Sequence, residues 1–247
     1  NSLLESIGYA LRTKVARWKG WYQKNVTRVI VLAEYSRTRI IEFGFSKQQI
    51  SVLPNVVFLP REKILNVEGD YVTYVGRLSA EKGVKTLIDA AMKLADIEFR
   101  IAGDGPLRAK LEESAPPNVK FMGWSNRAEI SKLYRHARLA VVPSICFETF
   151  GLTAADAMAH GLPVVASRLG GLCEIVDDNE TGLLFNPGDS IDLAKVIRTL
   201  WDDKTCAVRM GKAGYMKAAR EYSDNIYYKR LMKIYDAVIF ESSKDVL

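Results

Sequence analysis

The sequence predicts an α/β fold built on a Rossmann-like, doubly wound parallel sheet. Two observations support this prediction. From about residue 70 onward, short apolar runs that end in glycine or serine alternate with longer amphipathic segments, a pattern typical of parallel strand-helix-strand units. The short runs are apolar on both faces, as expected for strands that helices cover above and below. Ligands of such sheets bind beyond the carboxyl ends of the strands.

The predicted elements fall into three parts of the chain. The first part, 1–56, contains a helix over 1–24, a strand over 26–34, a short helix and a strand over 50–56, which is too little to close a domain. The second part, 57–222, is the Rossmann-like domain. Its buried strands are predicted at 71–76, 97–103, 118–123, 138–144 and 162–167, with helices between them and further helices over 190–203 and 205–222. The third part, 223–247, is a C-terminal helix that begins near residue 225.

Composition narrows the class of partner and the compartment. The chain has 247 residues and a net charge of +6, which points to an anionic partner, but no basic run or finger spacing indicates nucleic acid. No apolar run approaches the roughly 20 residues that span a bilayer. The three cysteines lack metal-ligand spacing and suit a reducing compartment, so we expect a cytoplasmic protein. They are Cys146, Cys173 and Cys206.

A basic amphipathic helix is predicted over residues 11–24. Its aromatic and aliphatic side chains recur at helical spacing, and lysines and arginines lie between them. Two interpretations stay open. The helix covers a core while its basic side chains are solvated, or it lies on an anionic membrane surface as a peripheral contact.

Two loops after predicted strands carry residues suited to a phosphate ligand. The loop "VGRLSAEKG" starts at Gly76 and places Arg77 and Lys82 between a strand and a helix, which suits a diphosphate, although two basic loop residues are often simply solvated. The loop "AGDGPLRAKL" has Gly103 and Gly105 after the next strand, and glycines there allow close approach of a ligand to the backbone. A plain strand-to-helix turn is the alternative. Arg108 stands where a dinucleotide fingerprint needs a third glycine, which argues against nicotinamide binding.

A third loop, "CFETFGLTAADAMAHG", combines two carboxylates with the start of a helix. The first amides of that helix form an anion site that suits phosphate. Glu148 and Asp156 are eight residues apart, which along a helix is about 12 Å, so we expect them to hold different parts of one long ligand. Carboxylates hold the vicinal hydroxyls of sugars and riboses. A helix cap is the alternative role for Glu148. The amides concerned are those of Phe150, Gly151, Leu152 and Thr153.

Several blocks together resemble glycosyltransferase family 4, retaining enzymes of the two-domain GT-B fold, and mainly the C-terminal, donor-binding half of that fold. The resemblance runs from Val29 to Ala237 and rests on the order and spacing of the blocks. They include "VGRLSAEKGVKTLIDA", "IAGDGPLRAKLE", "VKFMGW", "PSICFETFGLTAADAMAHGLPVVAS", "GGLCEIV" and "ETGLLFNPGD".

The resemblance implies a role for each candidate residue. Arg77 and Lys82 would hold the diphosphate of a nucleotide-sugar, and Glu148 would hold the transferred sugar, so that these three residues form the catalytic set. The amides of residues 150–153 would contact sugar and phosphates. Asp156 stands where the family usually has a glutamate that contacts the ribose, and Trp124 would lie beside the base. The implied reaction is transfer with retention to a glycan, lipid or small-molecule acceptor, with the leaving diphosphate stabilised without a metal or other cofactor.

The resemblance also implies that residues 1–56 are a remnant of the N-terminal acceptor domain and its linker. The glycine-rich loop and the histidine that this domain supplies have no counterpart in the sequence, and His136 and His160 do not replace them. The linker reads "NVVF" at 55–58, where the family usually has "NG-D". We therefore expect a chain that binds donor yet transfers little sugar alone and that dimerises through exposed surface of 1–56. Two alternative functions stay open. The chain is a stand-alone nucleotide-sugar-binding module that acts with a partner chain, or it is a GT-B nucleotide-sugar epimerase.

Overall fold

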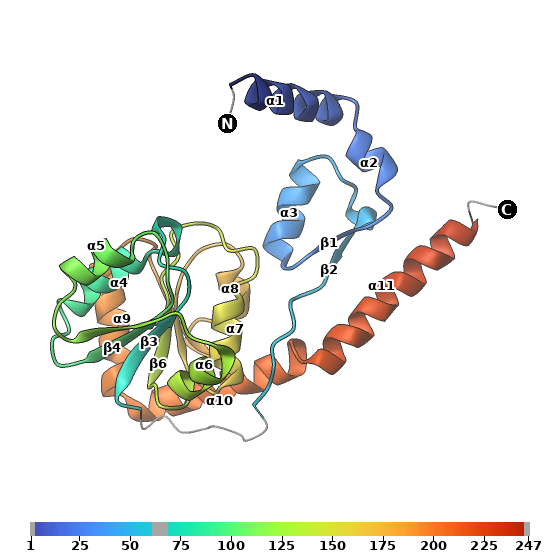
Figure 1. Cartoon of the computed structure of the whole chain (residues 1–247). Coiled ribbons are helices and arrows are strands. Elements are labelled where there is room, and N and C mark those ends of the chain that lie inside the picture. The colour runs from blue at the N-terminus through green and yellow to red at the C-terminus, as the bar shows by residue number, and fades with distance from the viewer. Residues whose placement is uncertain (1–2, 61–68, 245–247) are drawn as a thin grey trace. The chain divides into compact units, whose positions relative to one another are not determined.

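A computed structural model describes residues 3–60 and 69–244 of the chain (Figure 1). The chain divides into two compact units, Asn1–Leu53 together with Tyr228–Leu247, and Pro54–Tyr227. Parts of the predicted segments, residues 1–2, 61–68 and 245–247, lie outside the described residues. The second unit contains the candidate site.

The unit Pro54–Tyr227 is built on a six-stranded parallel sheet with the strand order β5-β4-β3-β6-β7-β8. The chain first builds outward from β3 through β4 to β5, and then returns to the other side of β3 to add β6, β7 and β8. The order therefore reverses between β3 and β6, which is where doubly wound sheets bind their ligands. The strands are β3 (Tyr71–Val75), β4 (Glu98–Ala102), β5 (Val119–Gly123), β6 (Leu139–Val142), β7 (Val164–Ser167) and β8 (Gly182–Phe185).

Helices cover both faces of this sheet, which confirms the predicted fold class (Figure 1). Buried leucines and isoleucines of α4, α5 and α9 pack on one face against alternate residues of the strands, such as Phe99, Ile101 and Val141. On the other face lie α6 and α7, and α7 packs against α10. The helices of this unit are α4 (Val84–Ala91), α5 (Arg108–Ser114), α6 (Arg127–Arg135), α7 (Leu152–Ala159), α8 (Leu172–Ile175), α9 (Ser190–Asp202) and α10 (Lys204–Glu221), with the 3-10 turn η2 (Ala80–Lys82).

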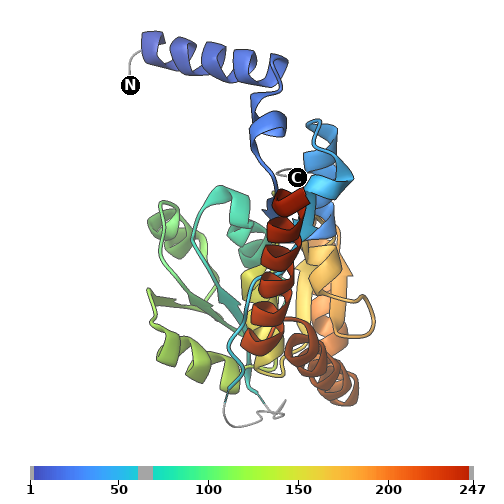
Figure 2. The same ribbon diagram turned by 90° about the vertical axis from the view of Figure 1, so that its right-hand side faces the viewer.

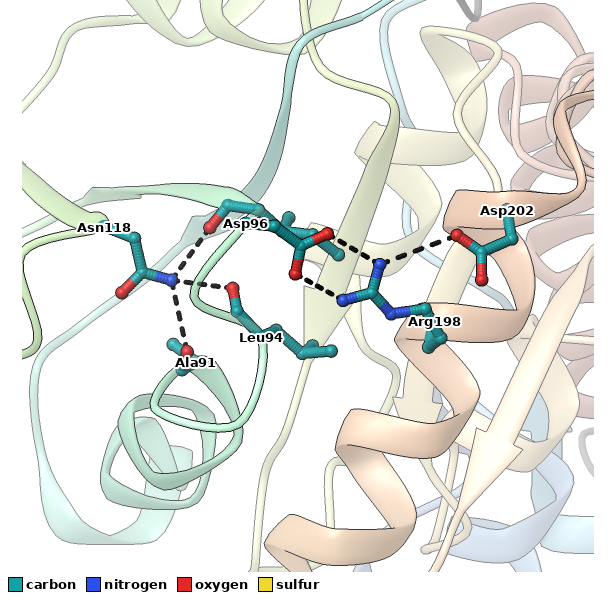
Figure 3. A network of polar contacts seen from close by, with 7 residues as sticks. Ala91, Leu94, Asp96, Asn118, Arg198 and Asp202 are labelled. Atoms are coloured by element: carbon teal, nitrogen blue, oxygen red, sulfur yellow. Dashed lines mark hydrogen bonds and ion pairs between the residues drawn. The ribbon is translucent and has the colours of Figure 1, made fainter.

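A polar network ties the turn between α4 and β4 to its neighbours (Figure 3). The Asn118 side chain donates from Nδ2 to the main-chain oxygens of Ala91, Leu94 and Ile97, at 2.8 to 3.1 Å. In the same turn the Asp96 carboxylate receives two hydrogen bonds from the guanidinium of Arg198 on α9. Asn118 thereby gives a second donor to the carbonyls of Ala91 and Leu94, which also accept the amides of Leu94 and Ile97 at 3.1 and 2.9 Å.

The unit Asn1–Leu53 with Tyr228–Leu247 contains a two-stranded parallel sheet, β1 (Val29–Val31) and β2 (Ile50–Val52). Arg28 beside β1 forms an ion pair of 2.6 Å with Glu241 on α11. The helix α11 is 21 residues long, and Figure 2 draws it from a second side. The helices of this unit are α1 (Leu3–Trp18), α2 (Trp21–Asn25), α3 (Glu34–Glu42) and most of α11 (Asp224–Lys244), with the 3-10 turn η1 (Lys47–Gln49).

The sequence predicted the type of most elements and missed β8 and α8. The segment "GLLF" of β8 is only four residues long, and short apolar runs between polar turns carry a weak signal. The predicted strands over 26–34 and 50–56 shrink to three residues each. In α1, Trp18 is 84% exposed and Tyr9 is 74% exposed, so the large aromatic side chains of this helix are not packed in a core, although Ala16 is buried.

Candidate functional site

The loops after β3 and β6, on either side of the strand-order reversal, lie against each other. The amide of Ile145 donates to the carbonyl of Glu81 at 3.0 Å. Gly83 has a left-handed backbone with φ of +66°, and a Cβ atom there would collide with the carbonyl of Pro143. Both features hold the first and third predicted loops together, so the structure brings Lys82 next to Glu148 across 66 positions of sequence.

The glycines of the second loop serve loop packing. A Cβ atom on Gly103 would collide with the carbonyl oxygen of Gly76, and one on Gly105 would lie 2.5 Å from that of Leu78. The backbones of the two loops are joined by hydrogen bonds from Leu78 to Asp104 and from Leu107 to Leu78, at 2.9 and 3.0 Å. The missing side chains therefore let the β4 loop support the β3 loop that carries Arg77.

Glu148 is held by two donors on one of its oxygens. Its Oε1 accepts from Lys82 Nζ at 2.5 Å and from Ser144 Oγ at 2.7 Å. Ser144 is 1% exposed, and the Glu148 side chain is 17% exposed. With Oε1 occupied, Oε2 is the oxygen that Glu148 can offer to a ligand hydroxyl. Glu148 thus forms an ion pair and accepts a hydrogen bond from Ser144, and within the described residues the N-cap of α7 is Gly151, without a side-chain cap from Glu148.

The backbone of the Glu148 loop rests on the segment that follows β7. The amide of Gly171 donates to the Glu148 carbonyl at 2.9 Å, and a Cβ on Gly171 would lie 2.9 Å from the same oxygen. Gly151, with φ of +100°, then begins α7. The amides of Leu152 and Thr153 in its first turn donate to no acceptor within the described residues, which leaves them available to an anion.

A first cavity of about 290 Å³ lies at the ends of β3, β4 and β5. It is lined by the predicted residues Gly76, Arg77, Gly103 and Trp124, among others. The carbonyl of Arg77 accepts a hydrogen bond of 2.9 Å from the hydroxyl of Tyr74. Burial, with a smaller contribution from the charges of Glu148 and Glu81, raises the pKa of Tyr74 above its ordinary value, so the phenol stays protonated and keeps donating.

Asp156 lies in a second cavity, of about 410 Å³, between α6, α7 and the segment 56–60. No hydrogen bond reaches its carboxylate from any of the described residues, and the nearby charge of Arg127 only partly offsets its desolvation. Burial raises the pKa of Asp156 to about 6, because the charged form loses water without gaining a partner. An unpaired, partly desolvated carboxylate in a cavity is suited to accept hydroxyl donors from a ligand. Ile130 lines both cavities, so they adjoin at this residue.

Three residues of the site were not predicted from the sequence. Ser144 and Tyr74 support Glu148 and Arg77 from strand ends, and His160 lies in the second cavity with Asp156. A serine two residues after a strand and four residues before a carboxylate is the signal that could have indicated Ser144. Tyr74 and His160 carry no local signal, because strands and helices contain such residues routinely.

Three further observations concern metal ligands, cysteines and helix length in the described chain. No group of three or more His, Cys, Asp or Glu side chains among the described residues is placed to hold a metal ion. The three cysteines are free thiols, as predicted. None of the helices over residues 3–60 and 69–244 is long and apolar enough to span a bilayer.

The unit Pro54–Tyr227 carries two adjoining cavities and the Lys82–Glu148 ion pair at the carboxyl ends of a doubly wound parallel sheet, and solved GT-B glycosyltransferases have the same fold. The chain belongs to the group 1 glycosyl transferases, whose family model matches residues 58–217. This finding confirms the GT-B family resemblance at the level of the group 1 enzymes.

Curated relatives and solved structures of this family differ in their named activities. The chain is 38% identical over 151 residues to a sulfoquinovosyl transferase of Arabidopsis thaliana. The matched residues cover 59% of this chain and 29% of that protein. It is 30% identical to a glycogen synthase of Mycobacterium tuberculosis over 86% of this chain and 55% of that protein. It is 28% identical to a 2-deoxystreptamine glucosyltransferase of Streptomyces kanamyceticus over 90% of this chain and 62% of that protein.

Among solved structures, sucrose-phosphate synthase from Thermosynechococcus elongatus superposes with a TM-score of 0.79 at 27% identity, covering 89% of this chain and 60% of that one. Anabaena HepE in complex with UDP superposes with a TM-score of 0.78 at 25% identity, and the match covers 87% of this chain and 65% of that one. The chain therefore spans less than two thirds of the length of these relatives.

Proposed function

We propose that this chain binds a uridine diphosphate sugar and that, within an enzyme of its relatives' length, it transfers the sugar to a glycan, lipid or small-molecule acceptor. The observation that supports the proposal is the ion pair of Lys82 with Glu148, whose loop leads into α7, where the amides of Leu152 and Thr153 have no acceptor among the described residues. The UDP complex of Anabaena HepE, which shares the fold at 25% identity, favours uridine as the base.

In the proposed mechanism the protein stabilises the leaving diphosphate with fixed charges and dipoles. Arg77 and Lys82 neutralise the phosphates, and the amides of residues 150–153 donate hydrogen bonds to them. Glu148 holds the sugar through Oε2, and Asp156 holds the ribose. No step of this scheme uses a metal. Retention at the transferred sugar, and membership of glycosyltransferase family 4, belong to the same proposal.

The experiment that tests this function separates Glu148 from Asp156. Glu148→Ala is expected to weaken binding of UDP-glucose about 10- to 100-fold, through lost hydrogen bonds to a charged group, while UDP itself binds equally well or more tightly. The reason for the second effect is that Lys82, released from its ion pair, becomes available to the diphosphate. Asp156→Ala is expected to weaken both ligands, because both contain the ribose. Isothermal titration calorimetry gives the affinities.

The matched control is Glu180→Ala, which removes an exposed glutamate in the turn between α8 and β8. It should leave both affinities unchanged. Equal losses for UDP and UDP-glucose in both site variants would contradict the division of roles. If neither UDP nor any other nucleoside diphosphate or its sugar binds the wild-type chain, the proposed function is wrong.

We expect the isolated chain of 247 residues to show negligible sugar transfer although its second unit folds. Transfer requires donor and acceptor to be held in reacting geometry with water excluded, and mispositioning alone costs orders of magnitude. An assay with UDP-sugars and a panel of acceptors measures this. Full turnover by the chain alone would show that its own residues complete the active site.

Exposed aromatic side chains of α1 and α2, including Tyr9, Trp18 and Tyr22, support the proposal that this chain also self-associates. Sedimentation of the isolated chain tests for a dimer. The competing proposal is that these helices, which also carry basic residues, contact an anionic membrane surface. Flotation with anionic vesicles tests this proposal.

A further inference from the structure

His160 joins two sides of the second cavity by hydrogen bonds from both ring nitrogens. Nδ1 lies 2.8 Å from the main-chain oxygen of Asp156, one turn earlier at the end of α7. Nε2 lies 3.1 Å from the hydroxyl oxygen of Ser131 on α6. The ring of Tyr134 packs against the imidazole with ring centroids 5.0 Å apart, which fixes the plane of the ring.

These contacts determine which atoms carry the protons. A carbonyl oxygen can only accept, so Nδ1 of His160 must carry a proton and donate it to the Asp156 carbonyl. In the neutral imidazole, Nε2 is then an acceptor, and the Ser131 hydroxyl must donate to it. The only proton of that hydroxyl is thereby used within the protein. The oxygen of Ser131 has lone pairs left, and Ser131 lines the cavity.

The imidazole stays neutral in this setting. Burial lowers the pKa of His160, and the hydrogen bond to the Asp156 carbonyl only partly opposes this effect. The charges of Arg127 and Arg135 lower the pKa further. A neutral His160 keeps one donor and one acceptor, which preserves the direction of the Ser131 hydroxyl.

We infer that Ser131, oriented by His160, forms with Asp156 a pair of hydrogen-bond acceptors that selects the vicinal diol of a ribose. The Asp156 carboxylate and the Ser131 oxygen come from facing helices and line one cavity, so each can accept from one hydroxyl of a diol. A ligand without these hydroxyls leaves the acceptors desolvated and unpaired, which is the form of mismatch that binding sites reject most strongly. Ser131 is then a specificity-determining residue, and His160 is a positioning residue that acts through it.

This inference rests on the proposed function for its ligand, but its first test does not. The chain has only two histidines, so the ring nitrogens of His160 can be resolved by nitrogen NMR of ¹⁵N-histidine-labelled protein, with His136→Asn to assign the signals. The ligand-free wild type at pH 7 is expected to show His160 as the Nδ1–H tautomer. Ser131→Ala is expected to change the Nε2 shift and leave the Nδ1 proton in place. The Nε2–H tautomer in the wild type would overturn the inference.

The second test measures selectivity for the diol. UDP is expected to bind at least tenfold more tightly than 2′,3′-dideoxy-UDP, with GDP and ADP and their dideoxy forms as parallel pairs in case uridine is not the base. Ser131→Ala and His160→Ala are each expected to reduce this ratio about five-fold. The double variant should reduce it no further, because both changes remove the same acceptor. A purely structural role for His160 would weaken both members of a pair equally and leave the ratio unchanged.

Ser114→Ala on α5 and His136→Ala at the end of α6 are the matched controls, and both should keep the wild-type ratio. A wild-type ratio near one, or a ratio that Ser131→Ala leaves intact, would overturn the inference while the proposed function stands. Failure of UDP, GDP and ADP alike to bind would overturn both.

Discussion

A variant in which Arg77 and Lys82 are both replaced by alanine is expected to bind UDP at least about 100-fold more weakly than the wild type. Each cation can donate a charge-assisted hydrogen bond to the diphosphate, and the loss of one such bond costs about 1.5 to 3 kcal/mol. Arg77 lines the cavity at the end of β3, and Lys82 Nζ lies 2.5 Å from the Glu148 carboxylate. The wild type should bind UDP equally well in EDTA and in magnesium, because these residues supply the neutralising charge.

Calorimetry of the wild type and the double variant, each in both buffers, measures these affinities. The control removes the same charges from exposed positions by Lys85→Ala on α4 and Arg220→Ala on α10, and it should bind UDP normally. Wild-type affinity that disappears in EDTA would show that a metal, and not this pair of side chains, neutralises the diphosphate.

The Asp156→Asn variant is expected to be more stable than the wild type at pH 8 and to bind UDP more weakly. Burial raises the pKa of Asp156 in the folded protein to about 6, from an ordinary value of 3.8. One pKa unit corresponds to about 1.4 kcal/mol, so the ionised carboxylate lowers the free energy of unfolding by roughly 3 kcal/mol at most. Asparagine has nearly the same shape and carries no charge to desolvate.

The sign of the pH dependence follows from proton binding. Between about pH 4 and pH 6 the folded wild type holds the Asp156 proton more strongly than the unfolded chain does, so its stability falls as pH rises through this window. Below pH 4 both states are protonated, and the two proteins should have similar stability. The free energy of unfolding, measured by urea denaturation from pH 4 to pH 8, should therefore show a gap that opens with pH.

Asp70→Asn, at an exposed position just before β3, provides the control for loss of one carboxylate. It should shift the stability curve by only a few tenths of a kcal/mol, as surface substitutions usually do. A gap between Asp156→Asn and the wild type that is absent at pH 8, or that closes as pH rises, would contradict the assignment of Asp156 as a desolvated and unpaired carboxylate. The expected exchange of stability for affinity is typical of binding sites.

Much of the candidate site follows from the sequence, because strand periodicity locates the strand ends. Arg77 directly follows a predicted strand, and Lys82 and Glu148 lie in the loops after predicted strands, which a parallel sheet brings to one edge. Asp156 lies in the helix that follows the Glu148 loop. The support of these residues could not be predicted in this way. Ser144 lies four residues before Glu148 and Tyr74 three residues before Arg77, but each pair meets only because its loop has one particular backbone conformation.

The glycines of the second loop also show the difference between what the sequence predicts and what the tertiary structure decides. From sequence, Gly103 and Gly105 indicate close approach of a backbone, but not which backbone approaches. In the structure their missing side chains make room for the carbonyls of Gly76 and Leu78. The close partner is therefore the neighbouring loop of the same protein, and the glycines contribute to the site by supporting Arg77.

The sequence by itself determined the class of fold, the edge of the sheet at which the candidate site residues gather and the chemical types of those residues. These properties depend on local periodicity and on the direction in which each strand runs. Both can be inferred from short stretches of consecutive residues. Only the tertiary structure decided that β3 and β6 are neighbours, that Lys82 meets Glu148, and that His160 faces Ser131. Such contacts depend on pairing between distant segments, whose register is set by the packing of the whole sheet and its helices.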